Sequence, residues 1–152
     1  MESGVILNEH ITASDYYTGP VGPGGLLPHE ARLNNDKYWI TNSTHPVDPW
    51  IQVAFDAYED TVTITGIRTQ GSTLSEWGEW VTKLQIQYGD TEDSLAYIMD
   101  GSAAKTFNAN SDEDTVVSIT FPQPISARFL RIIPKVWHEG IALRFEVIGC
   151  QN

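Results

Sequence analysis

The chain lacks the features that mark membrane spans, nucleic-acid binding or a disulfide-rich scaffold. Its 152 residues contain one cysteine, and no run of about 18 apolar residues predicts a membrane-spanning helix. Nine Lys and Arg stand against 20 Asp and Glu, which gives a formal net charge of −11. Because nucleic acid requires a cationic surface, this balance argues against a nucleic-acid partner. It also gives no general attraction to anionic lipid, although a local basic patch is compatible with it.

No leader segment is visible either. Met1 leads directly into ESGVILNEH, without the basic start and apolar core of a signal peptide. If the protein is secreted, we therefore expect that a signal has been removed or that the domain was cut from a longer chain. The length suits a single domain over residues 1–152.

Catalytic patterns are also missing. The four histidines lie in unrelated contexts, no G-x-S-x-G motif is present, and no Cys and His cluster has zinc-ligand spacing. Glu76 and Glu79 lie three residues apart, but in a predicted loop this spacing fixes no geometry for a pair of catalytic carboxylates. The acidic run from Asp112 to Asp114 is typical of a solvated turn. We therefore expect no enzyme activity and no cofactor.

What the sequence contains is a series of short apolar strands. Val62 and Ile64 alternate with threonines, and Leu84, Ile86 and Tyr88 alternate with polar residues, as in half-buried strands. Strands are predicted over Ile11–Ala13, Trp50–Phe55, Thr61–Gln70, Trp80–Tyr88, Ala104–Phe107, Val116–Phe121, Arg128–Ile133 and Ile141–Ile148. Pro122 and Pro134 are expected to end two of them, because proline cannot donate to a sheet. The last strand is apolar enough to be expected in the middle of a sheet. This pattern indicates an all-β sandwich or barrel.

Three long loops interrupt these strands. The first, from Asp15 to Glu30, is too rich in glycine and proline for a helix or a central strand. The second runs from Asn34 to Pro49, and the third from Gly71 to Gly78. Loops this long inside a compact domain are usually functional or disordered, so we expect a ligand site among them.

Several blocks occur in a recognisable order. They are MESGVI and ITAS near the start, ARLN, WIQVAF, GIRTQG, EWVTKLQIQY and the final stretch ARFLRIIPKVWHEGIALRFEVIGC. Together they resemble the discoidin domain, also called the coagulation factor V/VIII type C domain, over essentially the whole chain. The resemblance implies a jelly-roll β-sandwich or distorted barrel, from which the three loops project at one end. It also implies an extracellular protein, either secreted or the ectodomain of a membrane protein.

The resemblance bears on three further positions. Family members pair their last cysteine with one shortly before the position of Met1, so Cys150 is expected to be unpaired in this chain, with an accessible thiol. Some carbohydrate-binding relatives hold calcium near the position of Asn35 and Asp36, although an Asx turn is favoured there. Asn42 begins an Asn-Ser-Thr triplet for N-glycosylation, which is consistent with secretion.

Two function classes fit these loops. The first is a recognition module for a cell-surface glycan or protein, in which aromatic side chains stack or anchor and polar ones form hydrogen bonds. Its candidate aromatic residues are Tyr16, Tyr17, Trp39 and Trp77, and its candidate polar residues are Arg32, Lys37 and Asp48. Structural packing is an equally weighted interpretation for each of the four aromatic residues. Trp50, Trp80 and Trp137 are assigned to the core or to sheet packing.

The second class is a phosphatidylserine-binding module like those of the coagulation cofactors and lactadherin. The tip of the first loop carries Val21, Leu26 and Leu27, and the residues predicted to insert into lipid are Leu26, Leu27, Leu74 and Trp77. Glu30, Glu76, Glu79 and the net charge oppose binding to an anionic membrane, so this class ranks second. A neuropilin-type pocket for a C-terminal Arg ranks third, because Tyr17 fits it but the polar residues that complete it do not line up.

Overall fold

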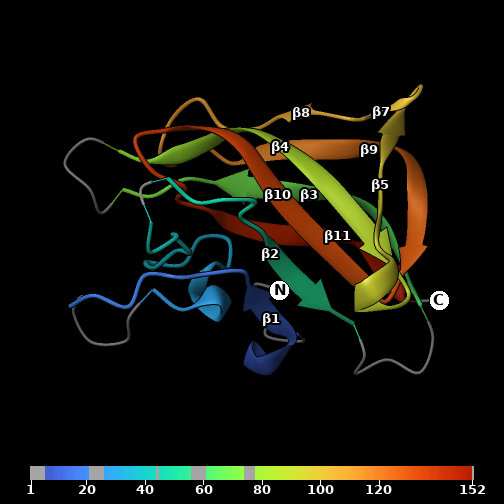
Figure 1. Ribbon diagram of the computed structural model, residues 1–152, viewed down its shortest axis with the longest axis horizontal. Coiled ribbons are helices and arrows are strands. Elements are labelled where there is room, and N and C mark those ends of the chain that lie inside the picture. The colour runs from blue at the N-terminus through green and yellow to red at the C-terminus, as the bar shows by residue number, and fades with distance from the viewer. Residues whose placement is uncertain (1–5, 21–25, 44, 56–60, 74–77, 152) are drawn as a thin grey trace.

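The computed structural model describes residues 6–20, 26–43, 45–55, 61–73 and 78–151, and they form two facing sheets (Figure 1). The larger sheet has the strand order β1-β2-β10-β4-β5, with β8 also paired to β4, and the smaller has the order β11-β3-β9. The larger contains β1 (Ile11–Ala13), β2 (Ile51–Ala54), β4 (Trp80–Gly89), β5 (Ala96–Tyr97), β8 (Phe107–Asn108) and β10 (Phe129–His138). The smaller contains β3 (Val62–Gln70), β9 (Val117–Ala127) and β11 (Arg144–Gln151). The predicted all-β sandwich is confirmed.

A hairpin and three short helices complete the described chain. The hairpin joins β6 (Met99–Asp100) to β7 (Ala103–Ala104), and the 3-10 turns are η1 (Asn8–His10), η2 (Pro28–Glu30) and η3 (Glu92–Ser94). None of the helices among the described residues reaches the length and apolarity that crossing a bilayer requires.

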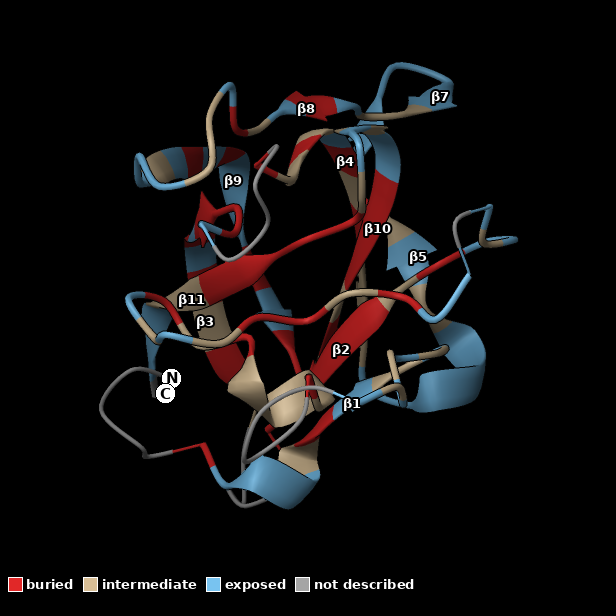
Figure 2. Cartoon of the chain, turned by 90° about the vertical axis from the view of Figure 1, so that its left-hand side faces the viewer, coloured by how far each residue is buried: buried red, intermediate tan, exposed pale blue. Residues whose placement is uncertain are grey.

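The core lies between the two sheets and follows from the alternation in the strands. Ile86 of β4 is paired with Ile132 of β10, and both side chains are completely buried. Opposite them, Ile64 and Ile67 of β3 and Phe145 of β11 are buried in the same cluster. In Figure 2 the red of buried residues is concentrated in β2, β10 and the start of β11. Burial of about 25 cal/mol per Å² of apolar surface is the main force that holds the sheets together.

Two prolines do not end the strands in which they lie. β9 continues through Pro122 because it is an edge strand that pairs only with β3. Its register moves from Ile64↔Ile125 to Gly66↔Thr120, so residues 121–124 lie outside the ladder. Pro122, which has no backbone N–H, therefore removes no hydrogen bond from the sheet. The prediction that this strand stops before Pro122 is therefore wrong.

The prediction for Pro134 is wrong for a related reason. β10 is central only from Phe129 to Ile132, where β2 pairs with it on one side and β4 on the other. Beyond Ile132 its pairing is with β4 alone, and the register shifts between Pro134 and Val136. Pro134 therefore lies where β10 has become an edge, and the strand continues to His138.

The last strand also differs from its prediction. β11 begins at Arg144 and is an edge of the smaller sheet, not a central strand. Its outer side is covered locally by the segment after η2, because Phe145 donates to the Ala31 carbonyl at 2.8 Å and accepts from the Leu33 N–H at 3.1 Å. Near its other end Cys150 is exposed, as expected for an accessible thiol.

Four strands meet at the end of the sandwich from which the loops project. Gln70 at the end of β3 is paired with Arg144 at the start of β11, and Trp80 at the start of β4 with His138 at the end of β10. This end lies on the left of Figure 1 and faces the viewer in Figure 2. We call it the loop end.

Candidate recognition site at the loop end

A cleft of about 170 Å³ opens at the loop end, and we call it the loop-end cleft. It draws residues from four segments that are far apart in the sequence. They are the first loop, the second loop, Glu79 directly before β4, and the end of β10 with the turn that follows it. The lining residues are Tyr17, Ile40, Thr41, Asn42, Ser43, Pro46, Glu79, Trp137, Glu139, Gly140 and Ile141. Described parts of the first and second loops line the cleft, and Glu79 lies directly after the third loop.

Two aromatic side chains contribute apolar walls to the cleft. Tyr17 is half-buried, and its backbone N–H donates to the Ile40 carbonyl at 2.9 Å, which fixes the first loop against the second. The ring of Tyr17 packs on a small cluster that contains Leu26 and Tyr38. Trp137 near the end of β10 is also half-buried and packs against the main core. Aromatic faces held rigidly in this way suit stacking on a sugar ring or on a flat side chain.

Two carboxylates give the cleft its charge. A Cβ atom at position 140 would lie 2.6 Å from Glu79 Oε1, so the absence of a side chain at Gly140 makes room for this carboxylate. Burial raises the pKa of the Glu79 carboxyl above its usual range, and the charge of Glu139 raises it further. Glu139 itself is exposed, with a positive φ of 58°. No lining residue of the cleft is Lys or Arg, so its field is negative.

Two of the predicted ligand residues turn out to be packing residues. Trp39 has an exposed fraction of 0%, and its indole N–H donates to the Asp15 carbonyl at 2.8 Å inside the protein. Its predicted role in ligand contact is wrong, because no face of the ring is open to a ligand. Leu26 is 6% exposed and packs against Tyr38, so it is not an apolar tip that inserts into lipid.

Other predicted residues lie outside the cleft lining. Arg32 donates to the Ile6 carbonyl at 2.7 Å and to Asn8 Oδ1 at 2.8 Å, and Lys37 Nζ lies 3.4 Å from Glu30 Oε1. Both cations are therefore bound within the protein. Further described candidates outside the lining are Tyr16, Leu27 and Asp48, of which Tyr16 and Asp48 are exposed. Val21, Leu74 and Trp77 lie outside the described residues.

Tyr17 is the one lining residue that the sequence predicted as a ligand contact, and three of the others define the cleft's ring face and charge. Trp137 was assigned to sheet packing, which is half correct, since one part of it packs on the core and another lines the cleft. Glu79 was interpreted as a solvated acid, and Glu139 carried no signal because a single Glu in a turn is common. Their proximity depends on the pairing of β10 with β4, which the residues alone do not reveal.

A family model described as the F5/8 type C domain matches residues 10–147. The chain belongs to the F5/8 type C domain family. Membership supports a non-enzymatic binding module, and it confirms the family named from the sequence.

Curated relatives of this F5/8 type C domain are much longer than the chain. It is 37% identical over 157 residues to the venom prothrombin activator omicarin-C non-catalytic subunit of Oxyuranus microlepidotus, covering 99% of this chain and 10% of the relative. It is 33% identical over 153 residues to neuropilin-2 of Homo sapiens, covering 99% and 16%. It is 33% identical over 156 residues to lactadherin of Bos taurus, covering 99% and 36%. The chain thus spans from about a tenth to about a third of these relatives.

Solved structures show the same fold. Discoidin II from Dictyostelium discoideum aligns with a TM-score of 0.68 at 20% identity, over 91% of this chain and 53% of the other. A CBM32 module from Clostridium perfringens, solved in complex with GalNAc-β-1,3-galactose, aligns with a TM-score of 0.69 at 14% identity, over 91% and 93%. The jelly-roll β-sandwich predicted for this F5/8 type C domain is therefore confirmed.

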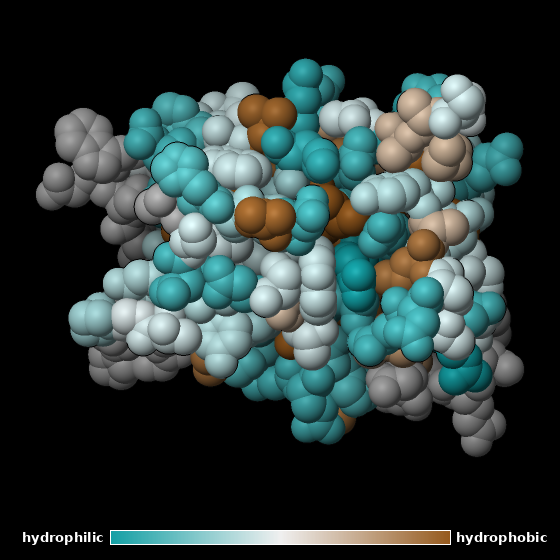
Figure 3. All heavy atoms as spheres, viewed as in Figure 1, coloured by the Kyte–Doolittle hydropathy of each residue, from teal (hydrophilic) through white to brown (hydrophobic). Residues whose placement is uncertain are grey.

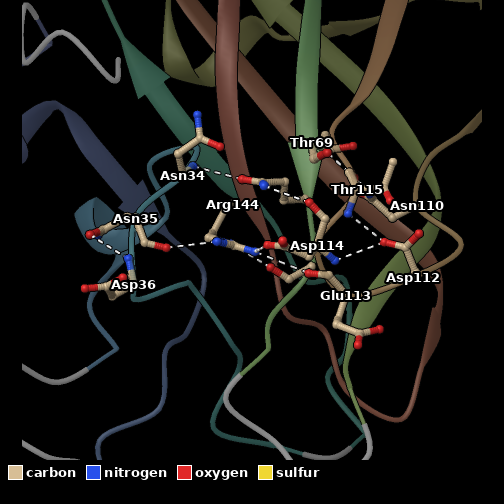
Figure 4. A network of polar contacts seen from close by, with 12 residues as sticks. Asn34, Asn35, Asp36, Thr69, Asn110, Asp112, Glu113, Asp114, Thr115 and Arg144 are labelled. Atoms are coloured by element: carbon tan, nitrogen blue, oxygen red, sulfur yellow. Dashed lines mark hydrogen bonds and ion pairs between the residues drawn. The ribbon is translucent and has the colours of Figure 1, made fainter.

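A buried arginine holds the loops of the domain in place (Figure 4). Arg144 Nε donates to the Gly71 carbonyl at 2.7 Å, and Nη1 donates to the Asn35 carbonyl at 2.9 Å. Its Nη2 lies 3.2 Å from the Glu113 carbonyl and 3.1 Å from Asp114 Oδ1. One side chain on β11 therefore connects the second loop, the third loop and the turn before β9. Figure 4 shows the guanidinium between these segments.

The weak calcium candidates take part in local hydrogen bonds. Asn35 Oδ1 accepts from the Asp36 N–H at 3.0 Å, and Asn35 Nδ2 donates to the Glu30 carbonyl at 2.9 Å. Among the described residues no three His, Cys, Asp or Glu side chains are grouped closely enough to hold a metal ion. The geometry therefore offers no support for a metal at Asn35 and Asp36.

Replacing Glu79 with Gln is expected to raise the melting temperature at pH 7. The folded state holds the Glu79 proton more tightly than the unfolded state does, because the pKa of this carboxyl is raised on folding. Stability therefore falls as the pH rises from the ordinary pKa to the raised one, and the loss is complete above the raised value. At about pH 3.5, below the ordinary pKa of about 4.3, the variant and the parent should melt alike.

Thermal unfolding at both pH values tests this expectation. Asp93→Asn, which removes an exposed carboxylate elsewhere, is the matched control and should have no effect at either pH. A Glu79→Gln variant that melts below the parent at pH 7 would contradict it.

Proposed function

We propose that this domain is a recognition module that binds a carbohydrate through the loop-end cleft, without catalysis. The observation that carries the proposal is the combination of two aromatic walls, Tyr17 and Trp137, with polar groups from Thr41, Asn42 and Glu79 in one cleft. Sugars present both a flat apolar face and a ring of hydroxyl groups, so they suit such a lining. A carboxylate such as Glu79 accepts hydrogen bonds from hydroxyl groups more strongly than a neutral acceptor does.

The size of the cleft limits the ligand. At about 170 Å³ the cleft is smaller than the pockets of about 300–1,000 Å³ that enclose drug-sized molecules. It suits one sugar unit, or one protruding side chain of a protein, and not a long polymer along its whole length. Two similar modules of Clostridium perfringens are in complex with galactose and with GalNAc-β-1,3-galactose, which supports sugars as the first class to test.

Binding to phosphatidylserine has less support. Leu26 is buried and is therefore lost from the apolar surface that insertion into lipid requires. Lys37 and Arg32 already form ion-pair or hydrogen-bond contacts with groups of the protein. Each basic residue near an anionic surface contributes about 1 kcal/mol, and carboxylates such as Glu139 oppose it. On the face shown in Figure 3, brown apolar residues form separate spots among hydrophilic ones.

We expect binding of a sugar to weaken about tenfold or more when Tyr17 or Glu79 is replaced. Losing a hydrogen bond to a charged group costs about 1.5–3 kcal/mol, and 1.4 kcal/mol is a factor of ten in affinity. The measurement is a glycan array with galactose, GalNAc and chitotriose among its members, followed by titration of each sugar that binds. Vesicles of graded phosphatidylserine content are tested beside it. The variants are Tyr17→Ala and Glu79→Gln.

Tyr16→Ala is the matched control, since Tyr16 is the neighbouring tyrosine, is exposed and lies outside the cleft lining. It should bind like the parent, and the melting temperature of each variant shows whether the fold is intact. If a sugar binds with equal affinity to the parent and to all three variants, its binding site lies outside the loop-end cleft. Tight binding to phosphatidylserine vesicles, absent with neutral lipid, would put the membrane function first.

The setting of the domain is part of the proposal. The chain spans a small share of its curated relatives, one of which is by name a component of venom. This supports a single module within a larger extracellular protein, either secreted or the ectodomain of a membrane protein. Its partner would then be a cell-surface glycan, or a glycosylated protein.

A further inference from the structure

The glycosylation triplet lies at the edge of the loop-end cleft. Asn42 and Ser43, its first two residues, are both exposed and both line the cleft, together with Glu79 and Trp137. The third residue, Thr44, completes the triplet in the sequence, and the residue after it is His45 and not proline. The one residue at which a glycan is expected is therefore part of the wall of the proposed binding site.

The backbone at Asn42 is held firmly. The Asn42 N–H donates to Asp15 Oδ2 at 3.0 Å, which ties the second loop to the first. On the other side, the Thr41 hydroxyl donates to the Ser43 carbonyl at 3.0 Å, and the His45 N–H donates to Ser43 Oγ at 3.1 Å. A glycan attached here would therefore start from a fixed point at the mouth of the cleft and would not swing away with a mobile loop.

We propose that Asn42 carries an N-linked glycan and that this glycan shields the loop-end cleft. That the glycan blocks a ligand rests on the proposed function, whereas the physical covering of the cleft by the glycan does not. In the modification, Asn42 Nδ2 forms a bond to C1 of the first N-acetylglucosamine of a lipid-pyrophosphate-linked oligosaccharide. The C1–oxygen bond breaks, the pyrophosphate leaves with the electron pair, and the amide loses one proton to the medium. The domain then exists in an open, unmodified form and a shielded, modified form.

The shielding follows from size and tethering. A branched oligosaccharide is much larger than a cleft of about 170 Å³, so it would cover the mouth instead of filling the interior. A group tethered by a short flexible link reaches an effective concentration in the millimolar range. Such a glycan therefore raises the apparent Kd of every free ligand by the reciprocal of the fraction of time for which the mouth is open.

A thiol placed in the cleft measures this access without any ligand. Glu79→Cys in a Cys150→Ser background leaves one thiol, on a residue that lines the cleft. The protein is made in a host cell that glycosylates secreted proteins, and mass spectrometry shows whether Asn42 is modified. The rate of labelling by a maleimide is then measured before and after the glycan is removed enzymatically. We expect the glycan to slow labelling by about three- to tenfold, which corresponds to a mouth that is covered for about two-thirds to nine-tenths of the time.

A second thiol and a relocated glycan serve as controls. Pro46→Cys, also in the cleft lining, replaces Glu79→Cys if thermal unfolding shows that the first variant does not fold. Thr44→Ala with Asp100→Asn moves the triplet to the hairpin of β6 and β7, which lies at the opposite end of the molecule in Figure 1. Asp100 is exposed, and its ion pair with Lys105 at 3.6 Å contributes little. In the variant with the relocated glycan, the thiol in the cleft should react with the maleimide at the same rate as in the protein without a glycan.

The labelling experiment can fail or succeed independently of the test for sugar binding. An Asn42 that stays unmodified in the glycosylating host overturns the proposal, and so does labelling at the same rate with and without the glycan. Slower labelling confirms the shield even if the array of sugars finds no ligand, in which case the proposed function alone fails. If a sugar does bind, the unglycosylated form should bind it more tightly than the form modified at Asn42, by the same factor as the labelling rates.

Discussion

Replacing Arg144 with Ala should lower the free energy of unfolding by about 3–5 kcal/mol. The side chain of Arg144 is 8% exposed and donates to the carbonyls of Gly71, Asn35 and Glu113. The Gly71 carbonyl is buried, so the loss of its donor costs about 1–3 kcal/mol, and the two partly buried carbonyls each add a smaller amount, which together account for the expected range. Asp114 adds little, because its carboxylate is 69% exposed and returns to water when the arginine is removed.

Arg144→Lys should recover only a small part of this loss. One ammonium group cannot reach the carbonyls on three sides that the planar guanidinium contacts in Figure 4. The measurement is equilibrium unfolding in urea, with Arg68→Ala as the matched control. Arg68 is an exposed arginine of β3, so its removal should change stability by less than about 1 kcal/mol. Equal losses for the two alanine variants would show that the Arg144 contacts stabilise the fold no more than an exposed arginine does.

A loss of binding should accompany the loss of stability. Arg144 connects the second and third loops to β11, and the loop-end cleft is lined by residues of the second loop and by Glu79, which follows the third. Without the arginine, the distance between these walls is no longer fixed. Even at a temperature where Arg144→Ala remains folded, we therefore expect weaker sugar binding than in the parent.

The strands could be predicted because their signal is local. Val62 and Ile64 alternate with threonines, and this pattern lies in a strand with one buried face. The prolines could not be placed correctly, because the rule that proline ends a strand holds only where both edges are paired. Whether Pro122 and Pro134 lie on an edge depends on β3 and β2, which are distant in the sequence.

The site was harder to predict than the fold for a similar reason. Trp39 and Trp137 are both tryptophans close to polar, turn-rich segments. The sequence makes Trp39 a ligand candidate with packing weighted equally, and it assigns Trp137 to packing. The structure makes Trp39 a core residue, because it forms a bridge with Leu143, and it opens Trp137 to the cleft. Only the family resemblance indicated that loops gather at one end. Which side chains point into the cleft depends on strand register, and a shift of one residue reverses the face of every side chain.

Replacing Trp39 with Ala should destabilise the domain by about 3–5 kcal/mol, the usual range for removing a buried aromatic side chain. The ring is completely buried, and its removal leaves a cavity and an unpaired Asp15 carbonyl. Trp39→Phe fills most of the space but still loses the hydrogen bond, so it should cost about 1–3 kcal/mol.

Tyr16→Ala is the contrasting variant, since it removes an aromatic side chain of the first loop that is 37% exposed, and it should cost clearly less stability than Trp39→Ala. Urea unfolding of the three variants tests the assignment of Trp39 to the core. A Trp39→Ala protein that unfolds at the same urea concentration as the parent but no longer binds a sugar would return Trp39 to the ligand site. The backbone hydrogen bonds between Trp39 and Leu143, both 3.0 Å, lie next to Ile141 of the cleft lining. If Trp39 is a core residue, a Trp39 variant should therefore lose sugar binding only under conditions in which the domain also unfolds.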